Sequence, residues 1–498
     1  MKQNHLFTYS KICALVLVGA GALIFTSCAK DGFDDESFDG GVSNTQVASL
    51  SADDITITPS ADGKSQTISW PVVMGAGGYR INLIDVSNPD EPLINDSIVD
   101  GCSVTTKREE DVNYQMTLLT LGNKSKNNTD ASETLEYAFS TFTPTFMTIP
   151  AGCDLTTWFA TNLPTDKIGE NLNFDLEGGA DYTISGLIDF DGQAVTLRSN
   201  SKDNHPTITL TSADAAINFT AGFNAKYLDF DCAARVGAKG VFEFSKSTTV
   251  TAASDIDPDV YAWTGPIITD PITIVSCNFV DLKSYLFYDN QAKTACMTFL
   301  VDNCVVHMTP ETSLGGGVFW TNKAGHINDL TVSNSTFYEP DDVAGDYKYF
   351  YQAGMATGPN LYVKDTPEYQ AATNSVNYLN CTFYHVTWNG GQWGNYNGMQ
   401  SKNYSYWIMK NCIFFDCSPT GVARRFLHGR TNQLHAEFAN NTYMNADGTF
   451  QEAENPTYDT SGTMIQEDPQ FANPAIGDFT ISGATQVARQ TGDPRWLP

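Results

Sequence analysis

From about residue 146 onward, apolar and polar positions follow a short pattern that recurs at irregular intervals. Six segments align without gaps, with apolar residues at the first and sixth positions, a small residue at the fourth, and Asn or Ser at the third. The third positions lie 27, 31, 46, 31 and 29 residues apart, and a degenerate copy, DFDCAA, begins at 229. The six segments are IVSCNF from 274, VDNCVV from 301, VSNSTF from 332, YLNCTF from 378, MKNCIF from 409 and FANNTY from 438.

This pattern predicts a sharp bend at its third position. Strict alternation cannot place the first and sixth side chains on one face of a strand, so the third position must change the phase. Asn is the non-glycine residue that best tolerates the left-handed backbone region. Coils that bend in this way stack into a right-handed parallel β-helix, in which each coil needs its neighbours to bury its apolar face.

A second apolar run lies between successive bends and predicts another parallel sheet on a different face of the coil. The two longest intervals leave insertions near residues 246–266 and 338–370, and insertions on one side of a solenoid usually build its binding face. The copies of the run are VFEFSK at 241, YLFYDN at 285, VFWTNK at 318, YFYQAG at 349 and RFLHGR at 425.

Residues 48–143 show a different pattern, with about seven short alternating segments separated by turn signals, which predicts a small β-sandwich. The stretch ISWPVVMGAGGYRINL resembles the B and C strands of fibronectin type III domains, with Trp70 as the core tryptophan. Tyr114 stands where such domains often carry a corner tyrosine. The predicted fold class is therefore all-β, with a fibronectin type III-like β-sandwich followed by a right-handed parallel β-helix over residues 144–498.

The N-terminus is typical of an exported lipoprotein. Residues 1–27 form a predicted signal peptide, whose apolar run is too short for a comfortable membrane span. The ending IFTSC resembles the lipobox of bacterial lipoproteins, which makes Cys28 the predicted lipidation site. The acidic tether over 28–47 resembles the surface-export signal of Bacteroidetes lipoproteins. We therefore expect a lipid anchor in the outer membrane, with the protein facing the cell exterior.

The net charge and the Cys and His contents limit the partners, disulfides and metal sites that we expect. With 28 basic and 57 acidic residues the net charge is −29, which repels nucleic acid and excludes it as a partner. The nine cysteines beyond Cys28 are odd in number and show no CxxC spacing, so we expect buried thiols. The seven histidines show no ligand spacing, so neither a metal site nor a cofactor is predicted.

Aromatic residues gather at similar distances after successive bends, which predicts that they are neighbours on one outer groove. Aromatic rings offer apolar faces to sugars, and interleaved amide and basic groups satisfy hydroxyl or carboxylate groups. The densest basic segment, GVARRFLHGRTN over 421–432, favours an acidic glycan. The alternatives are that the rings only pack loops and that the arginines only pair with local carboxylates. The candidate substrate-binding residues are Trp320, Lys323, Trp388, Trp393, Tyr396, Lys402, Arg424, Arg425, His428 and Arg430.

Catalysis is the second hypothesis, because parallel β-helices also host polysaccharide lyases and hydrolases. A lyase needs a base and a group that neutralises the uronate carboxylate, for which Arg424, Arg425 and Arg430 are the candidates, with Ca²⁺ as a possible cofactor. A hydrolase needs a pair of carboxylates, and Asp289 alone does not make one. No catalytic residue is assigned on this basis.

Taken together, these features resemble a family of Bacteroidetes outer-membrane lipoproteins with a pectate-lyase-like β-helix, found in polysaccharide utilisation loci. The resemblance includes the C-terminal stretch EDPQFANPAIGDFTISGATQVARQTGDPRW. It implies a surface glycan-binding protein that holds a plant-type, pectin-like polysaccharide near an outer-membrane glycan importer. A non-catalytic structural or adhesin-like surface protein is the third hypothesis.

Overall fold

The computed structural model describes residues 42–246, 265–310, 316–321, 324–340, 346–352, 374–389, 392–395, 405–427 and 435–498. Two compact units divide the chain, one ending at Thr143 and the other beginning at Pro144. Within the described ranges, no helix is both long and apolar enough to cross a membrane.

The first unit consists of two antiparallel sheets around one apolar core. The strand order is β1-β2-β5 in the three-stranded sheet and β4-β3-β6-β7 in the four-stranded sheet. Buried and partly exposed side chains alternate along β6, as in a sheet with one face on the core. The strands are β1 (Thr56–Pro59), β2 (Ser65–Ser69), β3 (Ala76–Asp85), β4 (Ile94–Val99), β5 (Ser103–Lys107), β6 (Asn113–Gly122) and β7 (Leu135–Ser140), with short 3₁₀ turns at Ala52–Asp54 and Lys124–Lys126.

Aromatic side chains hold the two sheets together. Trp70 and Tyr79 pack edge to face with ring centroids 5.3 Å apart, and both are buried. The Tyr79 hydroxyl accepts a hydrogen bond from the amide of Val73 at 2.9 Å. The Tyr114 hydroxyl accepts one from the amide of Glu109 at 3.1 Å, so this buried tyrosine ties its strand to the turn before it.

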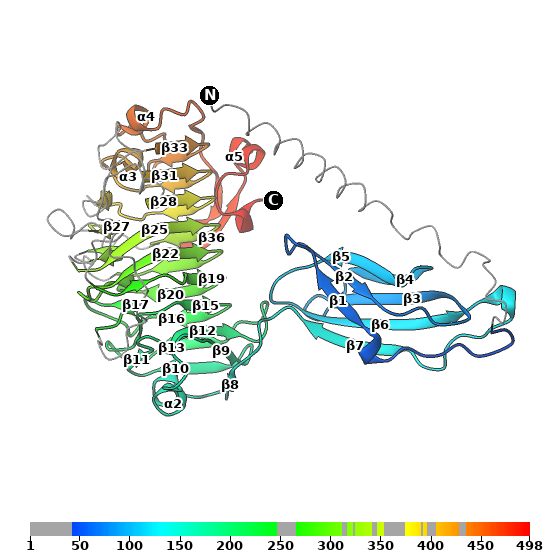
Figure 1. Ribbon diagram of the computed structural model, residues 1–498. Coiled ribbons are helices and arrows are strands. Elements are labelled where there is room, and N and C mark those ends of the chain that lie inside the picture. The colour runs from blue at the N-terminus through cyan, green and yellow to red at the C-terminus, as the bar shows by residue number, and fades with distance from the viewer. Residues whose placement is uncertain are drawn as a thin grey trace, which may run out of the picture. The chain divides into compact units, whose positions relative to one another are not determined.

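The second unit is a parallel β-helix in which three sheets follow one another around each coil (Figure 1). The first sheet contains β8 (Met147–Ile149), β9 (Asn171–Leu176), β12 (Ala194–Ser199), β15 (Phe223–Lys226), β19 (Ile272–Val275), β22 (Ala295–Asp302), β25 (His326–Ser333), β28 (Asn374–Leu379), β31 (Ser405–Lys410) and β33 (His435–Ala439), with β18 (Ile267–Ile268) beside β22. The second contains β10 (Asp181–Ile184), β13 (Thr207–Leu210), β16 (Asp229–Asp231), β20 (Asn278–Leu282), β23 (Val305–Met308), β26 (Thr336–Tyr338), β29 (Thr382–Tyr384), β32 (Ile413–Phe415) and β34 (Thr442–Met444). The third contains β11 (Leu187–Asp189), β14 (Ala216–Phe219), β17 (Gly240–Phe244), β21 (Tyr285–Tyr288), β24 (Gly317–Thr321), β27 (Lys348–Gln352) and β30 (Gln392–Asn395).

The corner between the first and second sheets is the predicted bend. All six third-position residues are left-handed, with φ values of 51° at Ser276, 54° at Asn303, 48° at Asn334, 53° at Asn380, 55° at Asn411 and 52° at Asn440. Side-chain amides link the later corners, since Asn411 donates to Asn380 at 3.0 Å and Asn440 donates to Asn411 at 3.0 Å. The bend prediction is therefore confirmed at every complete copy.

Inside the coils, the sixth-position rings stack along the axis. Phe337 and Phe383 lie 5.8 Å apart, and Phe383 and Phe414 lie 5.1 Å apart with nearly parallel planes. The fourth-position cysteines are buried free thiols, as expected, and so are most of the described cysteines. Each coil thus buries its apolar face only against the coils above and below it.

Two details of the predicted register are wrong. In the degenerate copy the bend falls at Tyr227, with φ of 59°, two residues before the predicted segment begins. The pairing of Phe230 with Phe279 fixes this register. The prediction matched Cys232 to the small fourth position, whereas Leu228 occupies it.

The other error concerns RFLHGR, which was predicted to be a strand. Of its described residues, Arg425 and Phe426 belong to the helix α3 (Val422–Phe426) and Leu427 is the C-cap, and the seventh strand of the third sheet is β30 instead. Buried residues recur here with helical rather than strand spacing, because Val422, Ala423, Phe426 and Leu427 all face the core.

The two ends of the β-helix are covered differently. Helix α2 (Leu155–Asn162) covers the first coil, with Leu155 and Phe159 buried. After α4 (Asn455–Tyr458), the C-terminal segment runs back along the outside of the second sheet (Figure 1). Phe479 of this segment packs against Tyr338 and Tyr384, with centroids 5.1 and 5.5 Å away. The segment comprises β35 (Phe471–Asn473), a 3₁₀ turn at Pro474–Ile476, β36 (Asp478–Ile481), α5 (Ala484–Arg489) and η4 (Pro494–Trp496).

Replacement of Asn380 tests the corner. Asn380→Ala forces an ordinary side chain into the left-handed region and removes the amide ladder, whereas Asn380→Gly removes only the ladder. We expect the alanine variant to be less stable than the glycine variant by about 1 kcal/mol in urea unfolding. Equal stability of the two variants would show that backbone conformation does not limit this corner.

Candidate functional site

A row of aromatic side chains follows the outer face of the third sheet. In-register pairing places Tyr288 beside Trp320, Trp320 beside Tyr351, and Tyr351 beside Asn395. The Tyr288 and Trp320 rings are 5.1 Å apart, and the Trp320 and Tyr351 rings are 6.3 Å apart with an angle of only 2° between their planes. Because neighbouring strands are about 4.8 Å apart, the row runs along the coil axis.

Trp320 is fixed by the backbone around it. The residue before β24 is Gly316, where a Cβ atom would collide with the indole ring. Tyr288 is 5 % exposed, whereas Trp320 and Tyr351 are half-buried. Stacking within the row covers ring faces, so the half-buried Trp320 and Tyr351 expose only part of their rings.

Two cations stand beside this row. The Lys348 ammonium lies 4.5 Å from the centre of the Tyr351 ring, a cation–π distance. Arg425 lies on α3, which packs on β30, and its Nε donates to the Thr420 hydroxyl at 3.2 Å. Within the described ranges, neither Lys348 nor Arg425 forms a salt bridge with a carboxylate. We call Trp320, Tyr351, Lys348, Asn395 and Arg425 the strip.

Burial shifts both cations toward their neutral forms. It lowers the pKa of Lys348, an effect that Asp346 opposes and Arg425 reinforces. It also lowers the pKa of Arg425, with Arg424 adding to the shift and Glu454 opposing it. The strip thus concentrates two partly desolvated positive charges in a chain of net charge −29.

Two further candidates, Arg424 and Trp388, have different environments. Arg424 is paired with Glu454, its Nη1 lying 2.9 Å from Oε1, so the pairing alternative holds for this residue. Trp388 is in the turn after β29, where its ring lies 5.9 Å from that of His385. Of the predicted set, Trp320 and Arg425 belong to the strip. Lys323, Tyr396, Lys402, His428 and Arg430 lie outside the described residues, as does Cys28.

The prediction that Trp393 faces an outer groove is wrong. Its side chain is fully buried, stacked on Tyr349 with centroids 4.7 Å apart and edge-on to Phe383 at the same distance. Strand alternation does not explain this, because two residues that are two positions apart would share a face; the regular pattern is broken in β30, where Trp393 lies at the level of buried Tyr349 and Asn395 pairs with half-buried Tyr351. Asn395 is therefore the residue of β30 that continues the strip.

Carboxylates near the strip serve the fold. Glu243, beside Tyr288 in the row, accepts the Gly240 amide at 2.7 Å and lies 3.6 Å from buried Arg235. Buried Asp289 accepts the Gly325 amide at 2.8 Å. Among the described residues, no three His, Cys, Asp or Glu side chains gather as metal ligands would.

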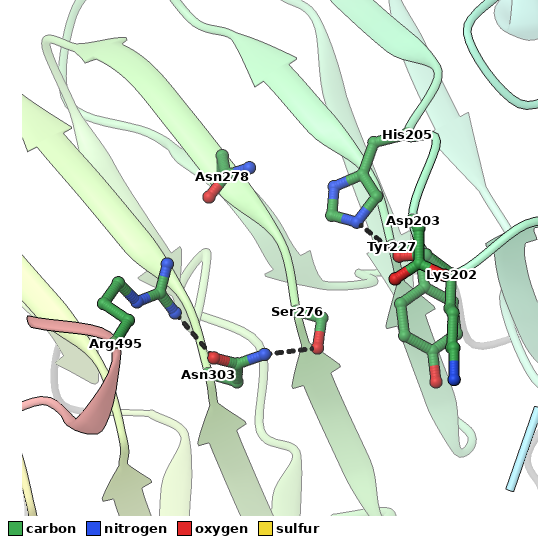
Figure 2. A pocket seen from close by; sticks show the side chains of 8 residues that line it. All are labelled: Lys202, Asp203, His205, Tyr227, Ser276, Asn278, Asn303 and Arg495. Atoms are coloured by element: carbon green, nitrogen blue, oxygen red, sulfur yellow. Dashed lines mark hydrogen bonds between the residues drawn. The ribbon is translucent and has the colours of Figure 1, made fainter. Parts of the chain in front are cut away.

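Sequence reasoning missed a second site, a pocket of about 340 Å³ at the corner between the first and second sheets (Figure 2). Arg495 of η4 reaches it from the C-terminal segment and donates to Asn303 Oδ1 at 2.7 Å. Asn303 in turn donates to Ser276 Oγ at 2.8 Å. The stretch GDPRW was noticed only as part of a resemblance, and no local signal places its arginine beside a corner 192 residues earlier.

Replacement of Trp393 tests the inward placement. Trp393→Ala should destabilise the β-helix by about 3 to 5 kcal/mol in urea unfolding, because it leaves a cavity between buried rings. Trp320→Ala, which removes a half-buried ring from the outer face of the same sheet, is the matched control and should cost less. A Trp393→Ala variant as stable as the wild type would contradict the assignment.

The protein families that match this chain cover three successive parts of it, and none has a known function. Three families of unknown function match it: DUF4992 over residues 1–180, DUF4957 over 180–340 and DUF5123 over 376–496. No curated protein matches.

Two solved structures are similar to this chain, with low identity and low TM-scores. Pectate lyase PelI from Erwinia chrysanthemi, in complex with tetragalacturonic acid, is 9 % identical, with 68 % of this chain and 84 % of that one covered and a TM-score of 0.20. The family 28 exopolygalacturonase from Yersinia enterocolitica is also 9 % identical, with 80 % and 96 % covered and a TM-score of 0.16. Such values establish no shared activity.

Proposed function

We propose that the β-helix binds an acidic, pectin-like polysaccharide along the strip. The observation that carries this proposal is the position of Lys348 and Arg425, which have no carboxylate partner in the described ranges, beside Trp320 and Tyr351. A uronate polymer offers carboxylates to the cations and C–H surface to the exposed parts of the two half-buried rings. Asn395 adds an amide that can both donate to and accept from hydroxyl groups.

Charge distribution supports an anionic rather than a neutral ligand at this site. The net charge of −29 repels a polyanion at long range, so binding depends on local cations. A guanidinium can hold a carboxylate with two parallel hydrogen bonds, and partial burial strengthens each contact. The same repulsion predicts that moderate salt aids approach, while high salt weakens the final contacts.

The proposal extends to the rest of the chain. Residues 1–27 would be removed on export, Cys28 would carry the lipid, and the tether over 28–47 would reach the outer surface of a Bacteroidetes outer membrane. Residues 48–143 would act as a fibronectin type III-like spacer. Support comes from the three-stranded and four-stranded antiparallel sheets, buried Trp70 and the Tyr114 hydroxyl bonded to the preceding turn. The β-helix would then hold glycan near an importer.

A lyase is the second candidate, and one observation favours it. Burial lowers the pKa of Arg425, which is the direction required of a general base. The second predicted arginine, Arg424, is already paired with Glu454. Binding without cleavage is therefore the proposed function, and ultraviolet absorbance of unsaturated products distinguishes the two.

Two charge-removing variants test the strip. Lys348→Met and Arg425→Gln should each weaken the binding of polygalacturonate by about tenfold, since each removes a charge-assisted contact. Titration calorimetry of the purified, lipid-free protein measures the loss. The matched control is Arg489→Gln, which removes an exposed cation of α5 that bonds only to the Thr463 carbonyl among the described residues. Wild-type affinity in both strip variants would contradict the proposal.

The pH dependence provides a second check on Lys348. The bound anion requires the protonated amine, and burial lowers the pKa of that amine. Affinity should therefore be complete below this pKa and should fall as the pH rises through it, earlier than for an ordinary lysine. Lys348→Arg keeps the charge and should flatten the profile. An identical alkaline decline in both proteins would show that another group titrates.

A further inference from the structure

The outer face of the first sheet carries an exposed ring stack on its last coils. Among the aromatic residues in the described strands of the β-helix, Tyr406 alone is exposed, at 38 %. It points outward from β31, where its neighbours Ser405 and Trp407 are buried. In-register pairing places it beside His435, and the two rings stack with centroids 4.6 Å apart and an angle of 12° between their planes. The stack therefore lies on the side of the sheet away from the core.

One face of the Tyr406 ring is covered by a ring and the other is not. The ring separation of 4.6 Å is close to the distance between neighbouring strands, about 4.8 Å, so the stack runs along the coil axis. The strands follow one another in the order β33, β31, β28 (Figure 1). His435 therefore covers the face toward β33, and the other face is directed toward β28. The in-register residue there is Ser375, whose side chain is too small to cover the ring.

The next coil supplies a carboxylate. Asp329 of β25 pairs in register with Ser375, so Asp329, Ser375 and Tyr406 form one row on the outer face. Ser375 Oγ donates to Asp329 Oδ1 at 2.8 Å, and Asn377 Nδ2 donates to Ser375 Oγ at 3.2 Å. These bonds fix the serine between the ring and the carboxylate. We call Tyr406, Ser375 and Asp329 the notch.

The spacing of the notch matches one sugar ring. Tyr406 and Asp329 are two strands apart, which is about 9.6 Å along the coil axis. A pyranose in contact with the tyrosine ring lies about 4 Å from it. The remaining distance of about 5 to 6 Å accommodates a hydroxyl group and its hydrogen bond to the carboxylate. A single sugar unit or a chain end therefore fits this space.

Asp329 can accept a further hydrogen bond. Its donors among the described residues are the Ser375 hydroxyl, the Ser375 backbone N–H and the Asn328 amide, which lies 2.6 Å from Oδ2. An ionised carboxylate has about four acceptor sites, which leaves one for a ligand hydroxyl group. Burial raises the pKa of Asp329, because the charged form is poorly solvated there. A hydroxyl donor from a ligand therefore stabilises the ionised form.

The charges around the notch favour a neutral ligand over an acidic one. Within the described ranges, Lys410 is the one cation among the outward-facing residues of β25, β28 and β31, and it is paired with Glu437. His435 lies on the far side of the Tyr406 ring. A uronate would therefore meet the Asp329 carboxylate without an uncommitted cation to offset the repulsion. Hydroxyl groups donate to the same carboxylate without this repulsion.

We propose that the notch binds a neutral pyranose unit, with a C–H face on Tyr406 and a hydroxyl group on Asp329. An aromatic face beside a fixed carboxylate serves both the apolar and the polar surface of a sugar. The notch lies on the first sheet and the strip on the third, and the two differ in charge. The proposal does not depend on acidic-glycan binding by the strip.

Saturation-transfer NMR on the lipid-free protein tests the proposal, with methyl β-galactopyranoside, methyl β-glucopyranoside and methyl α-rhamnopyranoside as neutral probes and galacturonate as the acidic probe. Tyr406→Ala removes the ring, whereas Tyr406→Phe keeps it and is the matched control. Ser375→Tyr places a second ring against the open face and fills the notch. Both positions face outward from the sheet, so the fold should persist in all three variants, which urea unfolding checks.

We expect at least one neutral glycoside to bind at millimolar concentration, with affinity reduced about tenfold by Tyr406→Ala and by Ser375→Tyr but unchanged by Tyr406→Phe. Absence of signal from all three neutral probes would overturn the proposal. So would neutral binding that both Tyr406→Ala and Ser375→Tyr leave intact, or a Tyr406-dependent signal from galacturonate alone. Lys348→Met and Arg425→Gln, in the strip, should leave neutral binding unchanged, so the two proposals fail separately.

Discussion

In the six coils of the aligned repeat, the chain turns from the first sheet to the second through a residue held in the left-handed region, and the positions of the neighbouring side chains depend on that corner. A strand alternates its side chains with a period of two, so without the corner the first and second sheets could not both direct Phe and Val inward. Asn supplies the conformation and an amide that bonds to the next corner, as between Asn380 and Asn411. Local backbone preference and stacking between coils therefore favour the same register.

The alignment of the corners also determines which side chains lie on the outer surface of the β-helix. On the third sheet it aligns Trp320 with Tyr351 and leaves Lys348 beside them. Among the seven corners from Tyr227 to Asn440, only the first departs from Ser or Asn, and its Tyr227 lines a pocket that Arg495 also lines. The strip and this pocket thus both depend on one repeated backbone feature.

The local parts of this architecture could be predicted from the sequence, because a left-handed Asn and a small buried neighbour leave a short, recognisable pattern. Tyr227 was not predicted to be a corner because tyrosine rarely adopts the left-handed conformation. The prediction for Trp393 was wrong because counting residues from a bend indicates how far along the coil a residue lies. The count does not indicate which face of the strand its side chain occupies. In α3 the buried residues are Val422, Ala423, Phe426 and Leu427. In so short a segment this spacing does not distinguish a helix from a strand unless the inward-facing positions are already known.

The corner pocket could not be predicted because it depends on contact between distant segments. Arg495 meets Asn303 only after the chain has completed all its coils and turned back along the second sheet. The C-terminal segment carries its own apolar signal in Phe479 and Trp496, which need a surface to cover. That signal indicates docking, but it does not specify which coil the segment reaches.

Hydrogen–deuterium exchange of the wild-type protein with and without oligogalacturonate tests the central claim most directly, because it locates the bound glycan without altering a residue. The account predicts slower exchange in peptides covering β24, β27 and α3, with no change in peptides covering Tyr227 and Ser276. Protection confined to the corner, or to the opposite first sheet, would contradict the assignment of acidic-glycan binding to the strip.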